Sequence, residues 1–243
     1  MTEALPTPPE APPSAGTASG TPSESSPARR ASFLATEHWS LLATRAMSWN
    51  ESFARTGMFL TSLSTATVSL ALVGSATSFG HEFIVFALIV LAVTLFLGVA
   101  TFVRLVQVNN EDLYWVAGMN RLRGQYAKLE PGIEDEFVTG TTLDAPGFAQ
   151  TYAAINVTGT SFLHSFVTTP GMVGLVCSVL AGVIAGLLTL QLMPMGPAIG
   201  VGLVVVVGAA VLCVVYAGRD NQAYVARMIR FIGDPTATRE DGS

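Results

Sequence analysis

The sequence is poor in charge and in cysteine. Charged residues make up 12% of the 243-residue chain, whereas an ordinary soluble domain has about 25%. Two cysteines are too few for a disulfide scaffold. A net charge of -5 and a pI of about 5.1 argue against a nucleic-acid-binding domain. Half of the residues are apolar and the mean hydropathy is +0.51, which excludes a disordered chain and makes a soluble enzyme improbable.

Motifs of enzyme chemistry are missing as well. The sequence contains no GxxxxGK[ST] phosphate loop, no GxSxG elbow and no CxxC pair. We therefore expect no enzymatic activity, no catalytic residue, no cofactor and no metal site. An active site built from scattered residues stays a third alternative without support. The carboxylates Glu130, Glu134–Glu136 and Asp144 indicate a solvated acidic loop, with divalent-cation binding as the less favoured interpretation.

Long charge-free windows dominate what is present. Four windows of 21 to 24 residues lack Asp, Glu, Lys, Arg and His, namely 57–79, 83–103, 170–193 and 197–218. About 20 helical residues cross a hydrocarbon core of roughly 30 Å. In the second window, 15 of 21 residues are Leu, Ile, Phe or Val, which favours insertion by roughly 5 to 9 kcal/mol. The sequence predicts an all-α integral membrane protein with four spans, arranged as two transmembrane hairpins because only short turns separate the paired windows.

The arginines near the span ends predict the orientation. Two short turns place the N-terminus, residues 104–169 and the C-terminus on one face of the membrane. Arginines within about 15 residues of a span end gather on this face; they are Arg45, Arg55, Arg104, Arg219, Arg227 and Arg230. We expect a multi-pass protein of the cell membrane with both termini in the cytoplasm.

The segments outside the spans divide the rest of the chain. Residues 1–31 hold most of the prolines and predict a disordered tail. Residues 33–130 form the first hairpin with its helical extensions, and 131–147 the acidic loop. Residues 148–169 predict an interfacial amphipathic helix, because apolar residues recur at steps of three and four. The second hairpin (170–218) is followed by a cytoplasmic helix over 219–233 and a flexible tail over 234–243.

Apolar stripes continue past the first two spans. They predict that two helices leave the membrane together and pack as a stalk. The stalk-packing candidates are Trp39, Leu42, Trp49 and Phe53 before the first span, and Trp115, Met119, Leu122 and Tyr126 after the second. Asp112 interrupts the second stripe. The alternative is that each helix lies flat on the headgroups, where Trp and Arg are also common.

Small and hydroxyl-bearing residues mark two span faces. Gly174, Ser178, Gly182 and Gly186 recur every four residues, which predicts close helix packing. The first span holds nine Ser or Thr among 23 residues. Thr61, Ser62, Thr65 and Ser69 share one face, which favours hydroxyl bonds to the backbone and leaves a pore lining as the alternative. Cys177 and Cys213 are expected to be small apolar fillers.

Four stretches carry a resemblance to a known family, namely residues 34–42, 49–53, 102–107 and 114–123. Together they resemble a family of uncharacterised bacterial four-span membrane proteins. The resemblance covers most of 33–230 and implies a bacterial cell membrane without implying an activity. More loosely, the plan is similar to that of SLATT-type two-span proteins, some of which are proposed to form pores, and this analogy favours a pore.

The expected function is that of a non-enzymatic membrane protein that self-associates and acts as a scaffold or interaction protein. Its expected partners are membrane lipid, further copies of itself and a cytoplasmic protein, with no nucleic acid. The alternative function is an oligomeric pore or channel lined by the Ser/Thr face of the first span.

Overall fold

A computed structural model describes residues 27–152 and 168–233. Every regular element in these ranges is helical: α1 (Pro27–Ala76), α2 (His81–Leu129), the 3-10 helix η1 (Ile133–Glu136), α3 (Ala145–Tyr152), α5 (Thr169–Leu190) and α6 (Met195–Gly233). Four of them, α1, α2, α5 and α6, are long and apolar enough to cross a membrane. The all-helical fold and the four candidate spans are thus confirmed.

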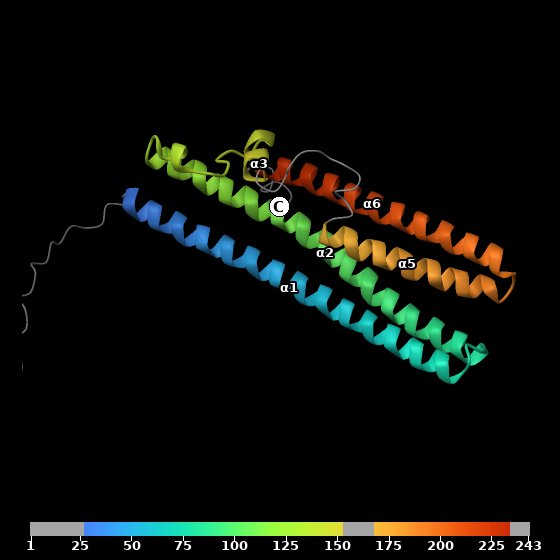
Figure 1. The fold of residues 1–243 in the computed structure, drawn as a ribbon. Helices are drawn as coiled ribbons and strands as arrows, with labels where there is room; N and C mark the ends of the chain where they lie inside the picture. The colour runs from blue at the N-terminus through green and yellow to red at the C-terminus, as the bar shows by residue number, and fades with distance from the viewer. Residues whose placement is uncertain (1–26, 153–167, 234–243) are drawn as a thin grey trace, which may run out of the picture.

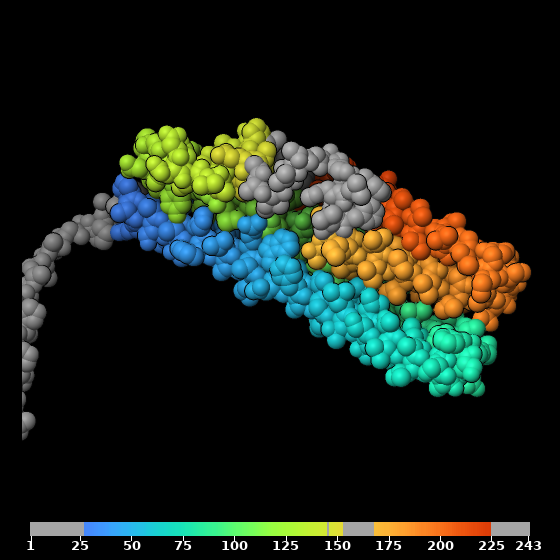
Figure 2. Space-filling model, in the orientation of Figure 1, coloured from blue at the N-terminus to red at the C-terminus, as the bar shows by residue number. Residues whose placement is uncertain are grey.

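The four long helices form two adjacent pairs. α1 packs along α2, α5 packs along α6, and α2 also contacts α5 and α6. The turns of the two pairs lie at the same end of the molecule, and α1 and α2 project beyond α5 at the other end (Figure 1 and Figure 2). We call this projecting part, residues 27–56 of α1 and 104–129 of α2, the extension. η1 and α3 lie against α2 here (Figure 1).

Helix bounds follow local signals. α1 begins at Pro27, inside the tail predicted for 1–31, because proline suits the first turn of a helix. It ends at Ala76, before Ser78 and Phe79 adopt left-handed φ values of 51° and 57°. At α5 the Thr168 hydroxyl accepts a hydrogen bond from the Gly171 N–H at 3.3 Å, and a proline occupies the first turn.

The structure describes only part of the segments predicted between and after the spans. The interfacial helix predicted for 148–169 begins earlier, at Ala145, where the Asp144 carboxylate accepts from the Gly147 N–H at 3.0 Å; residues 153–167 lie outside the described residues. The helix predicted for 219–233 is the continuous end of α6. The predicted tail over 234–243 and most of that over 1–31 also lie outside the described residues.

The apolar core lies where α1, α2 and α5 meet. It includes Phe59, Phe102 and Cys177, all at most 6% exposed. Gly98 of α2 permits this approach, because a Cβ there would lie 2.6 Å from Cys177 Sγ and 2.7 Å from the Phe59 ring. A larger residue at this point would force α1 and α5 away from α2.

Candidate functional site

Asp112 is the centre of a buried polar cluster in the extension. The residue is 6% exposed, and its carboxylate accepts four hydrogen bonds. Arg45 of α1 donates two, from Nε at 2.5 Å and from Nη2 at 3.0 Å. Trp49 Nε1, one helical turn further along α1, donates to Oδ1 at 3.0 Å, and the Tyr152 hydroxyl of α3 donates to Oδ2 at 3.1 Å. One carboxylate therefore joins three helices.

The electrostatics of this cluster favour a fixed, charged arrangement. The hydrogen bond to Asp112 raises the pKa of Arg45, against an opposing effect of burial. Burial first, and then the charge of Asp112, raise the pKa of the Tyr152 phenol. Tyr152 consequently stays a neutral donor and Arg45 a cation. Each donor is already bonded to the carboxylate, so the cluster has the chemistry of a structural clamp rather than of a catalytic group.

Asn120 forms a second polar contact about two helical turns further along α2. It is fully buried, and its Nδ2 donates to the carbonyl oxygens of Thr142 and Gly147 at 3.2 and 3.4 Å. Its Oδ1 accepts from Arg123 Nη1 at 3.0 Å and from the Thr151 hydroxyl at 3.1 Å. The side-chain amide thereby ties α3 and the loop before it to α2.

A charged network crosses α1 and α2 at the base of the extension. Arg104 donates to Glu51 at 3.1 Å and to Glu111 at 2.8 Å, and Arg55 donates to Glu51 at 2.8 Å. Hydrogen bonds from Arg104 and then Arg55 lower the pKa of Glu51. These partly exposed ion pairs coincide with the ends of the charge-free windows.

The predicted stalk residues of α2 and of α1 differ in their placement. Met119 and Leu122 are at most 9% exposed, and Trp115 and Tyr126 are half-buried. On α1, however, Trp39 is 70% exposed and Phe53 59%. Leu42 is also exposed, and only Trp49 reaches α2, through its bond to Asp112.

The face of α1 that packs on α2 is instead the neighbouring one. It carries His38, Leu41, Arg45, Ser48 and Ser52, all half-buried or buried. This corrects the predicted packing of Trp39, Leu42 and Phe53 against α2. The physical reason is that Arg45 must face Asp112 and that small serines let the two helices approach closely. We call the outward-facing residues Trp39, Leu42, Ala46 and Phe53 the α1 stripe; Trp49, the remaining predicted residue, is half-buried and bonded to Asp112.

The predicted pore-lining residues lie along a groove between α1 and α2. Thr61, Ser62, Thr65 and Ser69 line it together with apolar residues of α2, and its volume is about 440 Å³. The hydroxyls of Thr61, Ser62 and Thr65 each donate to the carbonyl oxygen four residues earlier, at 2.9 Å. These donors are thus satisfied within α1.

The predicted packing glycines lie at helix contacts of α5. A Cβ at Gly174 would lie 3.1 Å from the Phe102 ring, and one at Gly182 would lie 2.7 Å from the Gly202 carbonyl oxygen of α6. Ser178 is 1% exposed. Gly186 has more room, with the nearest atom 3.6 Å away.

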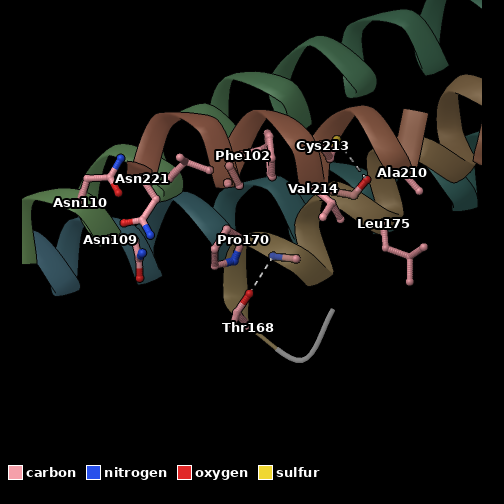
Figure 3. Close-up of a pocket in the computed structure, with 15 residues that line it drawn as sticks. Phe102, Asn109, Asn110, Thr168, Pro170, Leu175, Ala210, Cys213, Val214 and Asn221 are labelled. Carbon is pink, nitrogen blue, oxygen red and sulfur yellow. Dashed lines mark hydrogen bonds between the residues drawn. The ribbon is translucent and has the colours of Figure 1, made fainter. Parts of the chain in front are cut away.

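A cavity of about 280 Å³ opens between α2, α5 and α6, beside the base of the extension. Asn109, Asn110 and Asn221 gather at one end of it, while Phe102, Val214 and Leu175 lie toward the other (Figure 3). Asn110 Nδ2 donates to Asp220 Oδ2 at 2.6 Å, which joins α2 to α6. The cavity has one polar and one apolar end.

The acidic loop and the cysteines have no site geometry. Within 27–152 and 168–233, no three His, Cys, Asp or Glu side chains are grouped as a metal site requires. Glu134 and its neighbours in η1 are exposed or half-buried at the surface. Cys177 and Cys213 are free thiols in the packing of α5 and α6.

Comparisons with known proteins add no family: no family model, no curated protein and no solved structure matches the chain. Sequence reasoning noted Asp112 only as an interruption and missed Asn110, Asn120 and their partners. The available signal was a lone Asp on an apolar helix face, with Arg45 on the helix expected beside it.

Proposed function

We propose that this chain is a non-enzymatic, four-span membrane protein that self-associates through the α1 stripe and so acts as a scaffold or interaction protein. One observation carries the proposal. The α1 stripe runs over about 21 Å of helix in the extension, outside the charge-free windows, yet Trp39 and Leu42 in its outer part are 70% and 39% exposed. Apolar surface of this kind outside the lipid is typical of an interaction site.

The proposed topology places two hairpins in the membrane with the extension, α3 and both termini in the cytoplasm. The two interhelical turns lie at one end of the molecule (Figure 1). Arg55 and Arg104 lie at the opposite ends of the first two windows, and Arg219 follows the last one. An excess of arginine on this side favours the cytoplasm.

We also propose that the extension stands upright as a stalk. α1 and α2 are each continuous helices of 50 and 49 residues. A continuous helix of about 75 Å exceeds a bilayer core of about 30 Å. The clamp at Asp112 holds α1 and α2 together beyond the membrane. This contact would be lost if each helix lay flat on the headgroups by itself.

A second copy is the occupant that this geometry favours for the α1 stripe. Trp39 lies 18 residues before Gly57, or about 27 Å along the helix. The headgroup layer extends only about 5–8 Å beyond the hydrocarbon core, so lipid does not reach Trp39. Every copy presents the same stripe at the same height, and confinement to one membrane raises the effective concentration of copies.

The test is the oligomeric state in nanodiscs and in native membranes, by mass photometry and cross-linking. Trp39→Gln with Leu42→Gln should lower the oligomer fraction. Phe33→Gln with Met47→Gln is the matched control, since these side chains are 69% and 72% exposed on other faces of the extension. A monomeric wild-type protein across lipids and detergents, or equal effects of both pairs, would refute self-association through the stripe. Cross-linking to a cytoplasmic protein alone would indicate a heterologous partner instead.

The second candidate function is an oligomeric pore lined by the Ser/Thr groove of α1. The groove supports it because hydroxyl oxygens bonded to the backbone can still accept hydrogen bonds from water. In planar bilayers, replacing Ser62, Thr65 and Ser69 together by Leu should abolish any conductance of the wild-type protein. An unchanged conductance, or none in the wild type, would eliminate this lining.

A further inference from the structure

The cavity between α2, α5 and α6 extends along the direction of the helices. Its lining on α2 runs from Phe102 to Asn110, about 12 Å. Phe102, Val106, Leu175 and Val214 surround its inner end, on the side of the charge-free windows. A volume of about 280 Å³ far exceeds one water molecule, and the apolar walls of the inner end give water few partners.

The polar end holds two acceptors without donors. Asn110 is 2% exposed, and its Nδ2 must be the atom facing Asp220 because a carboxylate only accepts. This fixes Oδ1 as a buried acceptor with no partner, and Asn221 Oδ1 is a second one. Both residues line the cavity (Figure 3). Buried acceptors are costly unless a donor reaches them.

The charge beside this end selects the kind of donor. Asp220 Oδ2 lies 2.6 Å from Asn110 Nδ2 and so brings a carboxylate next to the amide that carries the first acceptor. None of the residues that line the cavity is Lys, Arg or His. A cationic donor is therefore favoured over an anionic or neutral group.

We propose that this cavity binds an amphiphile with a primary ammonium group, such as phosphatidylethanolamine. The ammonium donates to Asn110 Oδ1 and Asn221 Oδ1 beside the Asp220 carboxylate, and an apolar chain lies against Phe102 and Leu175. The inference rests on the four-span topology but not on self-association.

Lipid selectivity tests the proposal. Native mass spectrometry of the full chain would compare phosphatidylethanolamine, phosphatidylcholine and phosphatidylglycerol. Phosphatidylcholine is the sharp control, since its quaternary ammonium has the same charge and no N–H. We expect at least tenfold weaker retention of phosphatidylcholine, because one charge-assisted hydrogen bond is worth about tenfold or more and phosphatidylcholine would lose both. Asn221→Leu should reduce this preference, because Asn110 Oδ1 is then the one acceptor left.

A matched pair of variants locates the binding. Gly218 lines the cavity, whereas Gly208 of the same helix does not, and an added Cβ meets no atom within 4 Å at either position. Gly218→Leu should reduce phosphatidylethanolamine retention about tenfold or more, and Gly208→Leu should leave it unchanged. Equal retention of the three lipids, a preference for phosphatidylglycerol, or equal effects of the two glycine variants would overturn the proposal.

Discussion

Replacing Asp112 by Asn should open the extension. The variant keeps the size of the side chain and removes its charge. An amide offers one acceptor oxygen and one donor group, whereas the carboxylate accepts from Arg45, Trp49 and Tyr152 at 2.5–3.1 Å. At least one of these donors would then face the new NH₂ group without an acceptor.

The expected loss of stability follows from the burial of the Arg45–Asp112 ion pair. Breaking a buried ion pair costs about 3–5 kcal/mol. The Asp112 side chain is 7% exposed but that of Arg45 is 28%, so water partly solvates the abandoned guanidinium. We therefore expect a loss of about 2–4 kcal/mol, equivalent to about 30- to 900-fold in an opening equilibrium.

Hydrogen exchange of the full chain in lipid nanodiscs would measure this opening. Amides near residues 40–50 and 108–122 should exchange faster by that factor, while those of the spans stay unchanged. The control is Glu51→Gln, because Glu51 also accepts from two arginines but its side chain is 40% exposed; a much smaller increase in exchange is expected, since water solvates this exposed ion pair.

The double variant Arg45→Met with Asp112→Leu completes the experiment. An apolar pair of similar volume should recover part of the loss, since it abandons no charge. The recovery is incomplete because Trp49 and Tyr152 lose Asp112 as their acceptor. If Asp112→Asn opened the extension no more than Glu51→Gln, the clamp would not stabilise it. If the double variant were as open as Asp112→Asn, the abandoned Arg45 charge would not be the cause of the opening.

Three further predictions concern packing and pH. Gly182→Ala should cost about 1–3 kcal/mol in detergent unfolding, because its Cβ would lie 2.7 Å from a backbone oxygen, whereas Gly186→Ala should be neutral or stabilising by up to about 1 kcal/mol. Burial and then Arg123 lower the pKa of His38; exchange at the start of α1 should rise as pH falls below about 6.5, and His38→Gln should remove this dependence. Burial and then Asp112 raise the pKa of Tyr152. The neutral phenol therefore stabilises the folded extension below about pH 10, and this stabilisation is lost as pH rises through the folded pKa. Asp112→Asn should lower the pKa of Tyr152 measured by tyrosinate absorbance, with Tyr152→Phe as the blank.

The four long helices were predictable because charge-free windows of 21 to 24 residues have few other structural solutions. The exact ends of these helices were less predictable. The first window runs to Phe79, yet α1 ends at Ala76, since Ser78 and Phe79 form the turn with left-handed backbone. A hydropathy pattern does not distinguish an apolar residue in a turn from one in a helix.

The face of α1 that contacts α2 was mispredicted for a different reason. Periodicity assigns the most apolar stripe to the nearest interface, which placed Trp39 and Phe53 against α2. The observed interface turns Arg45, Ser48 and Ser52 inward instead. A buried ion pair and small side chains carry little weight in a hydropathy pattern, although they decide how two helices meet.

This arrangement separates two tasks of the extension. Polar contacts at Asp112 and Asn120 tie α1, α2 and α3 in one register, because a buried carboxylate or amide has few positions in which all its bonds are made. The large apolar side chains of α1 are thereby not needed for contact with α2. Trp39 and Leu42 stay exposed about 22–27 Å before the first charge-free window, where the chain's own described helices do not cover them. Had they been needed to hold α1 on α2, replacing them would unfold the extension. In this structure their replacement by Gln should instead change association and leave amide exchange at residues 108–122 unaltered.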